Sequence, residues 1–163
     1  MQDIKFHEVV EVICKEDTRY DRRAYGFVRA GLDFTVGEIR KKTPLKTAKS
    51  GTPVSRHISA PQLLDGMRAF TLDQFGPLSK TVLHEWGVRC CRDFGEIVYN
   101  LIEHGIFTKT PEDNREDFIE VFSFEDAFEK PFWPESRRNS QGGRGRQTER
   151  AHACAAGVAG GVA

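Results

Sequence analysis

Cysteine, histidine and carboxylate side chains form a reactive or metal-binding group only where the fold brings several of them together. The strongest such grouping in the sequence is the adjacent pair Cys90-Cys91, with His84 before it and His104 after it. Paired zinc ligands normally leave about two residues between the cysteines, so that both thiolates reach one tetrahedral ion. Because adjacent cysteines lack that gap, the sequence predicts no metal site.

The triplet Asp93-Phe94-Gly95 matches the magnesium-binding motif of protein kinases. The sequence holds no accompanying Gly-rich phosphate loop or catalytic-loop motif, and 163 residues are too few for a kinase. It also lacks a Walker loop, a nucleophile elbow and a dinucleotide-binding glycine pattern. We therefore expect no catalytic residue, no cofactor and no enzymatic activity.

Apolar residues at helical spacing predict the elements that position these groups. Five helices are expected at about 3–15, 21–41, 60–75, 77–86 and 93–104. Ser59 with Gln62, and Asp93 with Glu96, have the spacing of capping boxes at the start of the third and fifth helices. Ser123 or Glu125 could open one further helical turn.

After Gly105 the pattern changes to that of strands. Residues 106–108 predict one short strand and residues 118–124 a second, joined as a hairpin by the acidic loop 111–117. Helix, tight turn, helix, strand, hairpin and strand is the order of a winged helix. We therefore predict a mainly α fold with a small β-hairpin (α+β), a five-helix domain whose second half is winged-helix-like.

Composition divides the chain into a domain and a tail. Residues 1–133 form the predicted domain, which carries a long basic loop at 42–58. Residues 134–163 are rich in Arg, Gly and Ala and almost free of large apolar side chains, so a disordered tail is expected. The formal net charge of zero divides into +3 for this tail and −3 for the remainder, with 19 basic and 22 acidic residues in the remainder.

The charge of the second half argues against the usual partner of a winged helix. In that arrangement the second helix enters the DNA major groove, and phosphates require Lys and Arg. We instead predict a non-catalytic interaction or regulatory module that docks an unknown protein partner through an acidic helix and hairpin, leaving the pathway and the oligomeric state open. Its candidate partner-binding residues are Glu96, Tyr99, Asn100, Glu103, Glu112, Asp113 and Glu116.

A nucleic-acid-binding protein, either a winged-helix regulator or an RNA-associated protein, is the alternative, which the acidic helix disfavours. It would use the basic loop and the tail, where a single arginine–glycine element is typical of loose contact with RNA. Its candidate residues are Arg40, Lys41, Lys42, Lys46, Lys49, Arg144 and Arg146.

Six short motifs together resemble a known family. They are LDFTV at 32–36, QFGPL at 74–78, KTVLHEWGV at 80–88, DFGEIVYNLI at 93–102, REDF at 115–118 and FEDAF at 124–128. The chain resembles an uncharacterised conserved-hypothetical bacterial family, found chiefly in planctomycetes and verrucomicrobia, over about residues 4–133. The resemblance implies a shared domain in a bacterial cytosol and no particular reaction. The chain departs from it at Cys90-Cys91 and after Pro134.

The expected compartment is the cytoplasm. No apolar run in the sequence approaches the roughly 18 residues that cross a bilayer. The first ten residues lack the pattern of a secretory signal, and four cysteines without such a signal do not indicate a disulfide framework. We therefore expect no association with a membrane.

Overall fold

The structure is a computed structural model that describes residues 2–42, 58–119 and 121–136. Its elements are mostly helices, as predicted. The α-helices are α1 (Gln2–Glu16), α2 (Arg22–Lys42), α3 (Ala60–Phe75), α4 (Ser79–Glu85), α5 (Cys91–Glu103) and α6 (Phe124–Phe128). Short 3-10 helices occupy Gly76–Leu78 (η1), Arg115–Phe118 (η2) and Lys130–Phe132 (η3).

The five helices predicted from apolar spacing correspond to α1 to α5. The Ser59 capping box is present, with the Ser59 backbone N–H donating to the Gln62 side-chain oxygen at 3.1 Å. The predicted last helical turn is α6, and Ser123 is its cap, because its hydroxyl accepts a hydrogen bond from the Asp126 N–H at 3.0 Å. Apolar spacing and capping residues, which act within one helical turn, were therefore sufficient to predict these helices.

The predicted N-cap of α5, Asp93, was wrong by three residues. The helix begins at Cys91, with Cys90 as the N-cap, and Asp93 is the third helical residue. The Asp93 carboxylate accepts hydrogen bonds from the backbone N–H groups of Arg89 at 2.8 Å and Cys90 at 3.0 Å. An aspartate can serve at either end of a capping box, so its presence alone did not identify which end it occupied.

The predicted β-hairpin and winged-helix-like half are contradicted. No strand forms in the parts of 106–124 that the structure describes, where an irregular segment leads into η2 and then α6. The phenylalanines of this stretch pack on helices and pair with no other strand. Phe118 packs on Gly95 of α5, and Phe124 begins α6, where its ring lies 5.9 Å from Phe94 of α5 and 5.1 Å from Phe128. The mainly α part of the fold prediction is confirmed and the hairpin is not.

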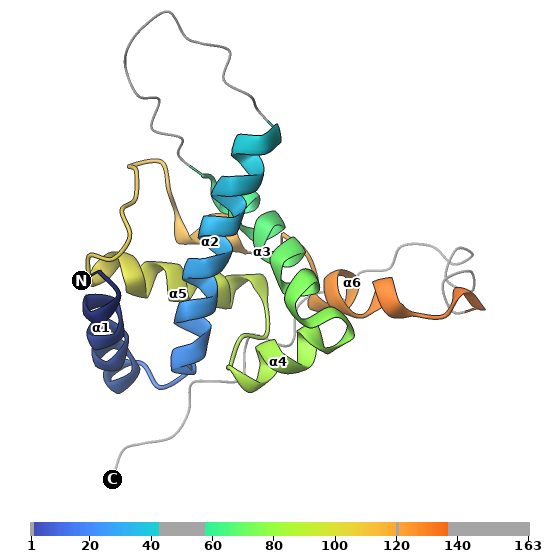
Figure 1. The fold of residues 1–163 in the computed structure, drawn as a ribbon, viewed down its shortest axis with the longest axis horizontal. Coiled ribbons are helices and arrows are strands. Elements are labelled where there is room, and N and C mark those ends of the chain that lie inside the picture. The colour runs from blue at the N-terminus through green and yellow to red at the C-terminus, as the bar shows by residue number, and fades with distance from the viewer. Residues whose placement is uncertain (1, 43–57, 120, 137–163) are drawn as a thin grey trace, which may run out of the picture.

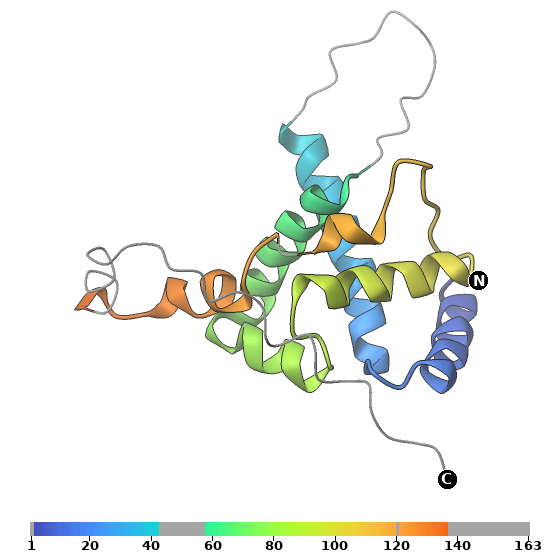
Figure 2. The same ribbon diagram turned by 180° about the vertical axis from the view of Figure 1, so that it is seen from behind.

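Helix α2 is the central element, with α3 beside it and α5 crossing it (Figures 1 and 2). Two glycines allow α2 and α3 to approach closely, because a Cβ at Gly31 would collide with Met67, and one at Gly66 would collide with Thr35. The core where these helices meet α5 is well buried and contains Tyr25, Leu64, Met67, Phe94, Ile97 and Leu101.

Some of the predicted features lie outside the described residues. Lys42 ends α2 and Ile58 precedes α3, so residues 43–57 of the predicted loop 42–58 are not described. Only residues 134–136 of the predicted tail are described. Within the described ranges, none of the helices combines the length and the apolar character that crossing a membrane requires.

Candidate docking surface on α5 and residues 108–118

The face of α5 that sequence analysis predicted to be open is partly covered. Tyr99 is only 5% exposed, and the Glu96 side chain is 15% exposed. Asn100 is half-buried, and of the four predicted α5 residues only Glu103 is well exposed, at 58% of its side chain. The prediction that all four lie on an open helix face was therefore wrong.

The turn between α1 and α2 covers the side of this face that carries Glu96 and Asn100. Asp17 and Arg19 form a two-pronged ion pair, with Arg19 Nη2 to Asp17 Oδ2 at 2.8 Å. Arg19 Nη2 also contacts Glu96 Oε2 at 3.4 Å, and the Asn100 amide donates to Asp17 at 3.0 Å. Because these partners are about eighty positions apart in the chain, no local pattern indicates that they meet.

The electrostatics of this turn keep the ion pair charged. The hydrogen bonds from Arg19 lower the pKa of Asp17 from 3.8 to about 2, although its partial burial acts in the opposite direction. Burial raises the pKa of Tyr25 to about 12. At neutral pH Asp17 is therefore an anion and the Tyr25 hydroxyl, which receives the Asn100 amide at 3.2 Å, is protonated.

Arg115 covers the other side of the face, which carries Tyr99 and Glu103. Its guanidinium contacts Glu96 Oε2 at 3.2 Å and forms a short ion pair with Glu103. It also lies over the Tyr99 ring, 4.7 Å from the ring centroid. One arginine therefore neutralises two of the predicted docking carboxylates and joins η2 to α5.

Two further contacts hold residues 108–118 against α5. The Tyr99 hydroxyl donates to the Asp113 carbonyl at 2.9 Å, and the Asp113 carboxylate accepts from the Thr110 N–H at 2.8 Å. Phe118 packs directly on Gly95, where an added Cβ would lie 2.7 Å from the Phe118 ring. Asp113 therefore organises the loop, in addition to the surface role predicted for it.

The carboxylates that remain at the surface lie mainly on this segment. Residues 108–118 contain four carboxylates and two cations, Lys109 and Arg115. Glu112, Glu116 and Asp117 are exposed, and none of the three forms an ion pair with any described residue. We call Glu103, Glu112, Glu116 and Asp117 the acidic surface. It retains three of the seven predicted residues.

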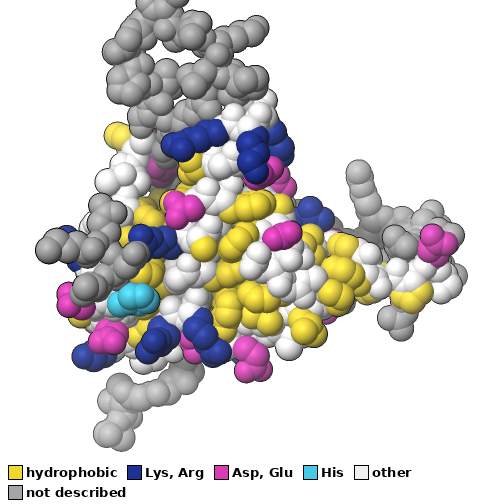
Figure 3. All heavy atoms as spheres, viewed as in Figure 1, with side chains coloured by type: hydrophobic (Ala, Val, Ile, Leu, Met, Phe, Trp, Pro, Cys, Tyr) yellow, Lys and Arg dark blue, Asp and Glu magenta, His cyan; other side chains and the backbone are white. Residues whose placement is uncertain are grey.

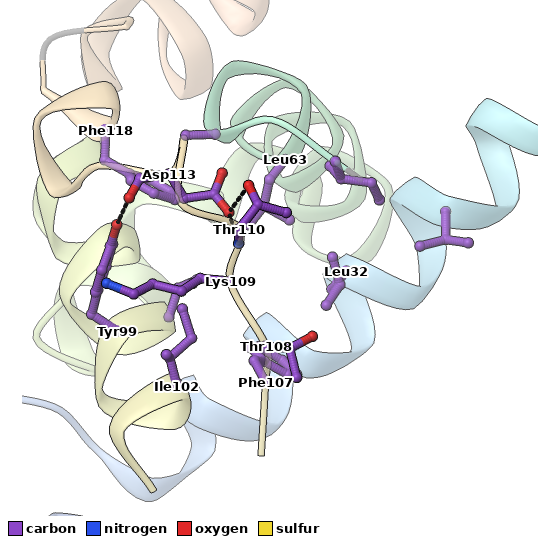
Figure 4. A pocket seen from close by; sticks show the side chains of 14 residues that line it. Leu32, Leu63, Tyr99, Ile102, Phe107, Thr108, Lys109, Thr110, Asp113 and Phe118 are labelled. Carbon is purple, nitrogen blue, oxygen red and sulfur yellow. Dashed lines mark hydrogen bonds between the residues drawn. The ribbon is translucent and has the colours of Figure 1, made fainter. Parts of the chain in front are cut away.

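A pocket of about 290 Å³ lies next to the acidic surface (Figure 4). Its walls come from α2, α3, α5 and residues 107–118, and they are mostly apolar. Leu32, Leu63 and Ile102 represent the three helices in Figure 4, and Phe107 and Phe118 close the remaining side. The pocket could not be predicted from the sequence, because its walls lie on four separate parts of the chain.

A second apolar feature is a row of aromatic rings along α2, α3 and the end of α4. Phe34, Phe70, Phe27, Phe75 and Trp86 contact in turn, with ring centroids 4.9–5.6 Å apart. All five are half-buried, and apolar side chains gather over α2 and α3 in Figure 3. Part of each ring therefore lies at the surface.

In the described part of the chain, the cysteines and histidines do not assemble into a reactive group. Cys91 is 2% exposed, its thiol donates to the Phe122 carbonyl at 3.2 Å, and burial raises its pKa. A buried, protonated thiol is a poor nucleophile. Among the residues that the structure describes, no three His, Cys, Asp or Glu side chains are placed to share a metal ion.

The residues of the nucleic-acid alternative are described only in part. Arg40, Lys41 and Lys42 form the exposed last turn of α2, where Lys41 pairs with Glu38 at 2.8 Å. The other four predicted residues lie outside the described part of the chain: Lys46, Lys49, Arg144 and Arg146.

Comparison with known proteins adds no family to these observations. The chain matches no protein-family model, and neither the curated proteins nor the solved structures yield a significant match to it. The resemblance to the bacterial family therefore stays a prediction.

Proposed function

We propose that the chain is a non-catalytic interaction module that docks a basic segment of a protein partner on the acidic surface. The observation behind this proposal is that Glu112, Glu116 and Asp117 are exposed and form no ion pair with any described residue. Exposed like charges attract an oppositely charged partner and guide its approach. The cytoplasm is the compartment in which we expect this encounter.

The geometry also favours a preformed surface. Arg115 and Tyr99 fasten the segment to α5, so a partner need not first order a loose loop. Binding to a preorganised surface avoids part of the conformational entropy cost of association. The docking surface is smaller than the seven residues predicted from sequence. Tyr99 and Glu96 hold residues 108–118 in place, and Asn100 bonds to Asp17.

The test is affinity capture with the full chain and two matched variants. Glu112→Gln with Glu116→Gln removes two charges from the acidic surface, and Glu8→Gln with Glu11→Gln removes two from exposed positions of α1. We expect nuclease-resistant protein partners that bind the wild type and the α1 variant and are lost from the acidic-surface variant. Captured nucleic acid alone, or equal partner recovery by both variants, would contradict the proposal.

A further inference from the structure

The pocket beside the acidic surface has walls that suit an apolar group. Leu32, Val36 and Leu63 line one side, and Ile102 and Phe107 line another. At about 290 Å³ it falls at the small end of ligand clefts, which are roughly 300–1,000 Å³. It therefore has room for one or two side chains.

Three polar residues of the pocket, Tyr99, Thr110 and Asp113, already bond to one another, and the other two, Thr108 and Lys109, are exposed. In Figure 4 the Tyr99 hydroxyl reaches the Asp113 carbonyl, and the Asp113 carboxylate reaches Thr110. The Thr110 hydroxyl donates to the same carboxylate at 3.1 Å. An occupant that brought its own polar groups inside would lose bonds to water without finding free partners. The chemistry of the walls therefore favours an apolar occupant.

The charge beside the pocket restricts what carries that apolar group. Asp113 lines the pocket, Glu112 precedes it in the chain, and Glu116 and Asp117 follow within the same segment. Lys109 is the cation among the lining residues, and its ammonium lies over the Tyr99 ring, 5.5 Å from the centroid. A partner segment that places a side chain in this pocket therefore lies against the mainly anionic residues 112–117.

We infer that the pocket receives one bulky apolar side chain, aromatic or branched aliphatic, of a partner segment whose neighbouring Lys or Arg residues face the acidic surface. This inference rests on the proposed function and names the kind of segment that is docked. Burial of the apolar side chain contributes binding free energy. The basic residues next to it provide specificity, because they attract the acidic surface.

The probe is a library of random peptides displayed against the full chain, followed by synthesis of the peptides that are enriched. We expect enriched peptides to combine Lys or Arg with one aromatic, leucine or isoleucine residue. Replacing that apolar residue with serine should weaken binding at least about tenfold, the factor expected when one buried side-chain contact is lost.

Two variants test whether the pocket is the seat of that residue. Thr108→Trp places a ring at the exposed rim of the pocket, and Thr81→Trp makes the same change at an exposed position of α4. Thr108→Trp should remove the tenfold preference and Thr81→Trp should retain it. Val36→Trp, which fills the pocket from α2, repeats the test if the first variant does not fold, as judged by circular dichroism.

The possible outcomes separate this inference from the proposed function. The inference is overturned if enriched basic peptides bind equally well after their apolar residue is replaced with serine. It is also overturned if the loss caused by serine persists in both Thr108→Trp and Val36→Trp. Either result leaves docking on the acidic surface standing. Apolar peptides without Lys or Arg, unaffected by Glu112→Gln with Glu116→Gln, overturn the proposed function and with it the inference. A selection without enrichment overturns both, leaving a small apolar molecule as the occupant that the walls would fit.

Discussion

Asp17 shows how a single carboxylate can connect distant parts of this molecule. It accepts three hydrogen bonds from Arg19, one from the backbone N–H and two from the guanidinium, and one from Asn100, and its side chain is 17% exposed. Through it the turn between α1 and α2 is fastened to Asn100, in the last turn of α5. An ionised group held in this way stabilises the folded state only while it stays ionised.

We expect Asp17→Asn to reduce stability at neutral pH by about 1–2 kcal/mol, a value discounted because Arg19 is itself well exposed. The folded pKa of Asp17, about 2, lies below the ordinary value of 3.8. Its contribution is therefore complete above the ordinary value and is lost as the pH falls toward 2. Urea unfolding of both proteins between about pH 6 and pH 2 should show curves that converge in acid. A constant difference across this range would mean that Asp17 acts through its shape and not its charge.

At the scale of elements, the contact between η2 and α5 decides whether the acidic surface is held in place. Phe118 is 5% exposed and sits on Gly95, with no room for a Cβ between them. Arg115 begins the same 3-10 helix and reaches Glu96 and Glu103. A change under Phe118 therefore acts on the surface without altering any of its charges.

Gly95→Ala should destabilise the fold by about 1–3 kcal/mol, because the added methyl group must displace the Phe118 ring. Gly37→Ala is the matched control, since Gly37 is inside α2 and an added Cβ there meets nothing within 4 Å. The control should be more stable than the wild type by up to about 1 kcal/mol, the helix preference of alanine over glycine. Chemical denaturation measures the stability of both variants. Equal effects of the two changes would show that the Phe118 ring moves aside at no cost in stability.

At the scale of the whole molecule, charge is divided between two regions. The exposed last turn of α2 carries Arg40, Lys41 and Lys42, while the acidic surface lies on residues 103–117. A zero total therefore conceals one region suited to cations and another suited to anions. The two functions proposed from sequence use opposite regions, so they can be tested on the same protein.

If docking of a basic protein segment is the function, binding of the full chain to labelled duplex DNA or RNA should be weak and should vanish near physiological salt. Changing Arg40, Lys41 and Lys42 together to Gln should leave the capture of protein partners unchanged. A gel shift at several salt concentrations measures the nucleic-acid contribution, whose salt slope falls by about one for each phosphate contact removed. Tight binding that these three changes abolish would favour the nucleic-acid alternative.

The helices could be predicted because their information is local. Apolar side chains recur at the spacing of a helix turn, and Ser59 and Ser123 lie within three residues of the groups they cap. The same local reasoning failed at residues 106–124, where alternating phenylalanines have strand spacing. A strand needs a paired backbone, and the apolar side chains here find helices to pack on instead.

What the candidate site looks like was decided only by the tertiary structure. Helical spacing alone places Glu96, Tyr99 and Asn100 together on α5, but Arg19 and Arg115 turn that face into an internal contact. The pocket likewise exists only where four parts of the chain meet. The amino-acid sequence by itself determined the helices, the absence of a catalytic motif and the acidic character of residues 112–117. The exposure and ion pairing of these side chains depend on contacts between residues far apart in the chain. Neither the spacing of residues nor the composition predicts which of these residues come into contact.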